Sequence, residues 1–259
     1  MIAKNKKRSY FLLKKETKRF LSILVAVVLV LGIAGARKLC AVPTLQLYIP
    51  GATYYEVNPY FPFDEDSWIT TENPFDLWVG GATSPAWVEY VDHVQLHVAL
   101  LKDEYLLYAG LEDPFITIEG EGQKWNLYAG DFTYGRPDGI SPHGIYDTYY
   151  ASVPLPKLLV STAGEIIYDY NKDFDPDNPE ASGSDLGDIQ YYTISYYPGF
   201  SFIHFDATGT AYGQGKAKDV FAPYSHDADY AVPEPCTMFL LGSGLIGLAG
   251  IGRRRLIKF

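Results

Sequence analysis

The chain of 259 residues has only two cysteines, Cys40 and Cys236. They lie near opposite ends of the chain, and Cys236 directly follows a Pro-Glu-Pro element at which we expect the chain to be processed. A disulfide between the two would not survive that processing. Disulfide bonds are therefore excluded as the main support of the fold, and an apolar core must stabilise it.

Basic side chains are scarce in the central part of the chain. Residues 37–231 hold 9 Lys and Arg against 29 Asp and Glu, a net charge of −20. Such a surface repels phosphate backbones, which excludes nucleic acid as a partner. It suits cations, calcium above all, and neutral or cation-bridged polymers. The need to keep the domain soluble would by itself also explain this negative charge.

Sequence motifs of common catalytic sites are missing. There is no phosphate-binding glycine loop, no zinc-type Cys/His spacing and no Gly-x-Ser-x-Gly elbow. His204 and Asp206 can be drawn into a hydrolase triad on paper, but neither Ser141 nor Ser201 has the context of a nucleophile. We predict that the chain is not an enzyme.

The N-terminal residues 1–36 are predicted to be a signal peptide. A basic lead over residues 1–19 precedes an apolar run from Phe20 to Ala36. The run ends in Ala34-Gly35-Ala36, and small residues at Ala34 and Ala36 suit a signal peptidase that cleaves after Ala36. The alternative is an uncleaved signal anchor.

Residues 37–218 are predicted to form an all-β, antiparallel, sandwich-like domain. Short aromatic or alternating runs are separated there by Gly, Pro and Asp, and no long stretch has helical periodicity. The candidate strands are Thr44–Ile49, Phe75–Val79, Val88–Leu101, Glu104–Tyr108, Phe115–Ile118, Trp125–Ala129, Glu165–Tyr170, Ile189–Tyr196 and Phe200–Phe205.

The clearest alternation places Val94, Leu96, Val98 and Leu100 on one strand face, opposite His93, Gln95 and His97. The two histidines would be about 13 Å apart on a strand, too far for one metal ion, and we expect exposed positions. Residues 219–231 are predicted to be a polar tether.

The segment 232–259 has three parts. Val232-Pro233-Glu234-Pro235 is followed by an uncharged run from Cys236 to Gly252 and then by Arg253-Arg254-Arg255. The run is about long enough for a transmembrane helix, and the arginines place its end in the cytoplasm. The prolines keep the preceding peptide extended, as a protease cleft requires. A plain tail anchor is the alternative interpretation.

This arrangement resembles the PEP-CTERM signal of Gram-negative bacteria. The resemblance implies recognition at Val232–Pro235 and processing by an exosortase-type transpeptidase at the inner membrane. The mature protein would then reside in the cell envelope, at the surface or in the extracellular matrix. The membrane and signal peptidase are further expected partners.

Motifs within the body are similar to the choice-of-anchor N proteins, over roughly Leu45 to Tyr212. They are Pro142-His143-Gly144-Ile145-Tyr146, Thr148-Tyr149-Tyr150, Ile203-His204-Phe205-Asp206, Leu45-Gln46-Leu47-Tyr48-Ile49-Pro50-Gly51-Ala52 and Pro74-Phe75-Asp76-Leu77-Trp78-Val79. The resemblance implies a surface-displayed domain and singles out His143, Gly144, His204 and Asp206 as motif residues. It supplies no catalytic residue.

Two further features suggest ligands. The acidic loop residues Asp173, Asp175, Asp177 and Glu180 could wrap a calcium ion, although the loop lacks the glycine and glutamate of an EF-hand. A solvated loop is the alternative. Aromatic side chains could form a platform on which sugar rings stack, and the alternative is that they lie in the core. The candidates are Trp68, Trp78, Trp87, Trp125, Tyr191, Tyr192, Tyr196 and Tyr197.

We therefore expect an exported protein with a structural or adhesive role in an exopolysaccharide or biofilm matrix. A carbohydrate-binding module or a polysaccharide-active hydrolase that uses the same export route is the alternative. Calcium is the one cofactor that the sequence suggests.

Overall fold

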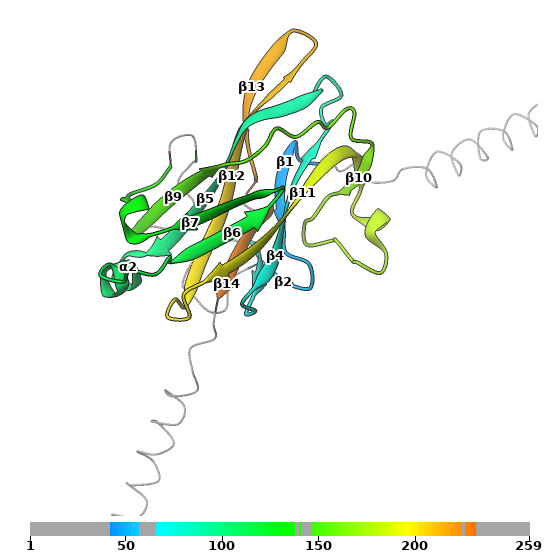
Figure 1. Ribbon diagram of the computed structural model, residues 1–259. Helices are drawn as coiled ribbons and strands as arrows, with labels where there is room; N and C mark the ends of the chain where they lie inside the picture. The colour runs from blue at the N-terminus through cyan, green and yellow to red at the C-terminus, as the bar shows by residue number, and fades with distance from the viewer. Residues whose placement is uncertain (1–41, 57–65, 138–139, 141–146, 224–225, 232–259) are drawn as a thin grey trace, which may run out of the picture. The chain divides into compact units, whose positions relative to one another are not determined.

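Strands of 2 to 13 residues, many of them rich in aromatic and β-branched residues, build two sheets (Figure 1). The structure, a computed structural model, describes residues 42–56, 66–137, 140, 147–223 and 226–231. All of them belong to the unit Ala41–Phe259. The predicted signal helix and the predicted transmembrane helix lie outside the described residues. No helix among the described residues is long and apolar enough to cross a membrane.

Sheet A has six strands, all paired antiparallel. Their order is β1 (Leu45–Tyr48), β4 (Phe75–Ala82), β11 (Ser184–Tyr196), β6 (Ile116–Gly120) and β7 (Gln123–Leu127), with β10 (Glu165–Tyr168) also paired to β11.

Sheet B has eight strands and is antiparallel except for one parallel pair, β3 with β14. Its order is β2 (Thr53–Tyr55), β3 (Ser67–Thr70), β14 (Asp227–Ala231), β12 (Phe202–Gly213), β5 (Tyr90–Leu101), β9 (Thr148–Pro154) and β8 (Thr133–Tyr134), with β13 (Lys216–Phe221) also paired to β12. The described residues also contain one short α-helix, α2 (Lys102–Tyr108), and two 3-10 turns, η1 (Ala129–Asp131) and η2 (Pro179–Ala181).

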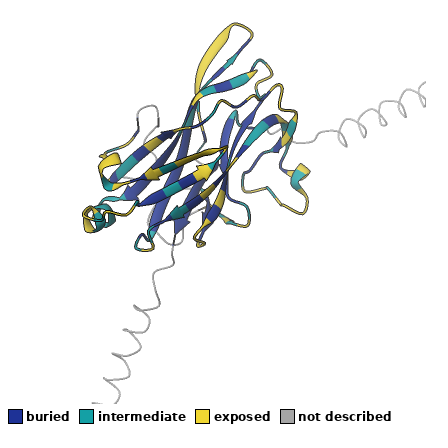
Figure 2. Cartoon of the chain, viewed as in Figure 1, coloured by how far each residue is buried: buried dark blue, intermediate teal, exposed yellow. Residues whose placement is uncertain are grey.

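One hydrophobic core joins the two sheets. Val94, Leu96, Val98 and Leu100 of β5 are fully buried in it, which confirms the predicted apolar face of this strand. The same cluster contains apolar residues of β1, β4 and β11 from sheet A, and burying each such side chain stabilises the fold by about 1.5–3 kcal/mol. Two sheets with a shared core form a β-sandwich, so the predicted fold class is confirmed. Figure 2 shows the buried residues along the central strands and the exposed residues on β13 and the loops.

The prediction of a strand over Glu104–Tyr108 is wrong, because these residues belong to the helix α2. A short apolar run does not distinguish a helix from a strand. Asp103 and Glu104 occupy its first turn, where negative charge favours a helix. Tyr105 and Tyr108, three residues apart on one helix side, pack against Tyr149 and Phe200.

The prediction of a polar tether over residues 219–231 is also wrong for the described part. Residues 219–221 continue β13, and all five residues of β14 are buried. β14 lies between β3 and β12, and the Tyr230 ring packs against Tyr196 of sheet A with centroids 4.1 Å apart. Its acidic residues suggested a solvent-exposed segment, whereas Asp227 and Asp229 are each 1% exposed and Asp229 pairs with Ser67 and His204 inside the protein.

Candidate functional site

A buried polar cluster lies on sheet B, on the side of β12 and β14 that faces away from the main core. Alternate residues of a strand share a face. In β12, His204 and Asp206 therefore share one face while Ile203 and Phe205 enter the core. In β14, Asp227 and Asp229 alternate in the same way with Ala228 and Tyr230. The sequence-based expectation that His204 and Asp206 share a strand face agrees with this arrangement.

The His204 imidazole lies between two carboxylates. Its Nδ1 is 2.7 Å from Oδ1 of Asp229, and its Nε2 is 3.1 Å from Oδ2 of Asp206. The Ser67 hydroxyl on β3 donates to the other oxygen of Asp229 at 2.5 Å. His204 and Asp229 are each 1% exposed, so these contacts form in a low-dielectric setting where they are strong.

Burial and the neighbouring carboxylates shift the pKa of His204 in opposite directions. Burial alone lowers the pKa of an imidazole, because it disfavours the charged form. The carboxylates of Asp206 and Asp229 outweigh this effect and hold the pKa of His204 well above its ordinary value.

Ser67, Asp227 and Asp229 were not identified from the sequence. The period-two pattern Asp227-Ala228-Asp229-Tyr230 could have indicated a strand with one polar face, but we assigned it to a tether. Ser67 has no local signal, because β3 joins the cluster only through its pairing with β14.

His97 of β5 is the neighbour of this cluster in register, opposite Asp206. The sequence predicted an exposed position, and this prediction is wrong, because His97 is buried with only 5% of its surface exposed. Its Nδ1 contacts the Ser152 hydroxyl at 2.7 Å, and its Nε2 contacts the Thr208 hydroxyl at 2.8 Å. Burial lowers the pKa of His97 to about 4, although the Asp206 carboxylate acts in the opposite direction.

This lowered pKa predicts acid sensitivity. An unfolded chain binds a proton at His97 near pH 6.5, whereas the folded chain does so only near pH 4. Neutral His97 therefore contributes to the free energy of unfolding above pH 6.5, and this contribution is lost as the pH falls toward 4. Between pH 6.5 and 5 we expect a loss of roughly 1.5 kcal/mol from this residue.

Urea unfolding of residues 37–231 at several pH values measures this effect. His97→Gln retains groups that can bond to Ser152 and Thr208 but does not titrate. Its stability should fall less steeply than that of the unmodified domain between pH 6.5 and 5. Equal slopes for the two proteins would contradict the prediction.

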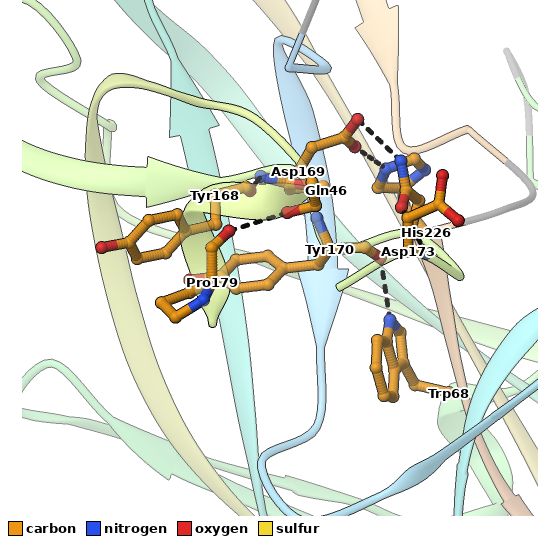
Figure 3. A network of polar contacts seen from close by, with 10 residues as sticks. Gln46, Trp68, Tyr168, Asp169, Tyr170, Asp173, Pro179 and His226 are labelled. Carbon is orange, nitrogen blue, oxygen red and sulfur yellow. Dashed lines mark hydrogen bonds and ion pairs between the residues drawn. The ribbon is translucent and has the colours of Figure 1, made fainter. Parts of the chain in front are cut away.

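A second network anchors the acidic loop to the core (Figure 3). Gln46 of β1 donates to the Tyr168 carbonyl at 2.7 Å and accepts from the Tyr170 amide at 3.2 Å. The Trp68 indole donates to the Tyr170 carbonyl at 2.8 Å. These side chains satisfy the backbone where β10 ends, so the loop begins at a fixed point.

Asp169 continues this network. Its Oδ1 is 2.6 Å from Nε2 of His226, just before β14, and its Oδ2 accepts from the side-chain Nδ2 of Asn171 at 2.7 Å. Asp169 and His226 are both buried. The loop is thereby held against the segment that leads into β14.

The acids of the predicted calcium site lie beyond this anchor. Asp173, Asp175, Asp177 and Glu180 line the loop surface, and Oδ1 of Asp175 accepts from the Asp177 amide at 3.0 Å. Within the described ranges, the only group of three or more potential metal ligands with gathered donor atoms is elsewhere, at His204, Asp206 and Asp227. Calcium binding by the loop stays a prediction.

Calcium binding by the loop would raise the melting temperature of residues 37–231. Free calcium at a hundred times its dissociation constant would stabilise the folded domain by about 2.7 kcal/mol. Asp175→Asn with Asp177→Asn should abolish the shift, and the first of these changes retains a side-chain oxygen that can cap the turn. An unchanged melting temperature at millimolar calcium would refute calcium binding by the loop.

The other predicted site residues are distributed as follows. His143 and Gly144 of the family-like motif, the cleavage residues Ala34 and Ala36, and the sorting residues Val232–Pro235 and Arg253–Arg255 lie outside the described residues. Of the serines considered for a triad, Ser201 donates its hydroxyl to Glu104, whereas the contacts of His204 are with Asp206 and Asp229. These contacts do not join Ser201 to His204.

The aromatic residues divide into core and surface. Trp68, Tyr192 and Tyr196 are buried in the core. Trp78 and Tyr191 are cross-strand partners on β4 and β11, with ring centroids 5.3 Å apart, and Tyr191 is 46% exposed. Trp87, Trp125 and Tyr197 are partly exposed, as Trp78 is, so Tyr191 is the one exposed member of the expected platform.

Comparisons with known proteins identify the end of the chain. Residues 231–255 match the family of the PEP-CTERM protein-sorting motif. The match begins at Ala231, the last residue of β14. The motif indicates an exported surface protein that an exosortase-type enzyme processes at the membrane. It confirms the predicted sorting signal, and the signal implies an exosortase-type processing partner.

No curated protein matches the chain. Among solved structures, the collagen-binding domain from a Staphylococcus aureus adhesin matches 62% of this chain and 89% of its own, at 8% identity and a TM-score of 0.19. A likeness at this level carries no argument about function. None of these matches bears on the similarity to choice-of-anchor N proteins, which stays a prediction.

Proposed function

We propose that the β-sandwich is a structural or adhesive component of an exopolysaccharide or biofilm matrix outside a Gram-negative cell. The observation that carries the proposal is the sorting motif, which begins where the last strand ends. The net charge of −20 over residues 37–231 supports a role among cation-bridged polymers. The resemblance to choice-of-anchor N proteins adds support for surface display.

The position of the motif has a consequence for the precursor. Only residues 232–235 separate β14 from the apolar run that begins at Cys236. Four residues span at most about 14 Å. The domain is thus kept close to the membrane until the chain is cut, and exposure to the matrix depends on processing.

Cell fractionation tests the proposed location and role. In a host that makes exopolysaccharide, the processed domain should be recovered with the extracted matrix, and a strain without the protein should form a matrix that retains less polymer. Recovery only from the membrane fraction, with an unchanged matrix, would contradict the proposal.

A carbohydrate-binding role is the second candidate, and the surface pair Trp78 and Tyr191 favours it. Aromatic rings of this kind stack on the apolar faces of sugars. A glycan array probed with residues 37–231, with and without calcium, would detect binding that Tyr191→Ala removes. A polysaccharide hydrolysis screen would detect catalysis. A negative result in both assays would leave the structural role.

A further inference from the structure

The buried polar cluster on sheet B combines side chains that bind metal ions. His204, Asp206 and Asp227 each offer one ligand atom, and these atoms lie within 4.8 Å of one another. We propose that these three residues bind a first-row divalent transition-metal ion of the zinc type. This inference does not depend on the proposed matrix role.

The separations suit one ion after a small adjustment. Two ligands at about 2.0–2.1 Å from a tetrahedral zinc ion are roughly 3.3 Å apart. Nε2 of His204 and Oδ2 of Asp206 are already 3.1 Å apart. The widest separation in the group is at most 4.8 Å, so binding one tetrahedral ion requires it to close by at most roughly 1.5 Å. The ligands come from neighbouring paired strands, so the backbone holds them at a fixed register.

Asp229 has the role of a positioning residue. Its Oδ1 lies 2.7 Å from Nδ1 of His204, which directs Nε2 toward Asp206 and the ion. The Ser67 hydroxyl binds the other oxygen and fixes the carboxylate. A carboxylate behind a metal-binding imidazole is a common arrangement, and it sets the tautomer and orientation of the ring.

The donor set selects the class of ion. One imidazole nitrogen with two carboxylate oxygens suits zinc, iron or manganese, whereas calcium and magnesium take oxygen ligands. Three protein ligands leave a fourth position for water or another ligand. The site therefore differs in chemistry from the exposed acidic loop, whose expected ion is calcium.

Zinc binding to the full chain tests the proposal. The untagged chain, purified in detergent and stripped with a chelator, should bind one Zn²⁺ per chain in competition with a chromophoric chelator. Asp227→Asn and His204→Gln should weaken this binding at least about a hundredfold, and Asp229→Asn about 10–100-fold. His97→Gln and Asp175→Asn are matched controls, a buried histidine and an acid outside the cluster, and should bind as the unmodified chain does.

X-ray absorption of the zinc-loaded, unmodified chain keeps the proposal falsifiable if a variant fails to fold. The proposal requires a shell of nitrogen and oxygen ligands that includes one imidazole. Sulfur ligands near 2.3 Å would place the ion at a cysteine instead and overturn it. Absence of zinc binding, or unchanged affinity in a folded Asp227→Asn chain, would overturn it as well.

Discussion

Replacing residues 227–231 with alternating Gly and Ser is expected to prevent residues 37–231 from folding. β14 is buried throughout and is the strand through which β2 and β3 join the rest of sheet B. The replacement also removes Tyr230 from its contact with Tyr196 and removes Asp227 and Asp229, the two acids that β14 contributes to the polar cluster. These losses together are comparable to the whole stability of a domain, about 5–15 kcal/mol.

Near-ultraviolet circular dichroism and urea unfolding report on this result, because aromatic rings fill the core. The matched control is the same replacement over residues 216–220 of β13, a mostly exposed strand that pairs with β12 and with no other strand in the described part of the chain. The control should fold with a small loss of stability. A cooperative unfolding transition in the β14 variant would show that the segment is a tether after all.

Changing Pro233, Glu234 and Pro235 to alanine is expected to stop processing of the chain. The two prolines keep the peptide extended and the glutamate adds a charge, so the variant loses both the shape and the charge that a transpeptidase recognises. Full-length protein should accumulate in the membrane instead of a shortened, exported form.

Immunoblots of membrane and extracellular fractions measure the distribution. A variant with Lys216, Lys218 and Asp219 changed to alanine alters three exposed residues of β13 and should be processed normally. If the alanine variant at 233–235 is shortened to the same extent as the unmodified chain, the sorting element lies elsewhere.

Local patterns predicted the centre of the sandwich well. Val94, Leu96, Val98 and Leu100 alternate because one side of β5 enters the core, and all four are buried. The opposite side was expected to be exposed, yet His97 is buried and bonded to Ser152 and Thr208. Such partners come from other strands, so no pattern within β5 could reveal them.

The buried polar cluster also depends on partners from other strands, which local sequence patterns do not reveal. His204 and Asp206 were singled out as motif residues, and their shared face follows from strand geometry. Asp227 and Asp229 were assigned to solvent because acids usually are exposed. Asp229 is compensated inside the protein by His204 and by Ser67, which is distant in sequence. Only the pairing of β14 with β3 and β12 brings these residues together.

Intact-mass and terminal-peptide mass spectrometry of the protein recovered from a native host tests the central claim most directly. The account predicts a mature chain that begins after Ala36 and has lost the segment beyond the Pro-Glu-Pro element. Recovery of the full 259-residue chain from the cytosol, with both ends uncut, would contradict it.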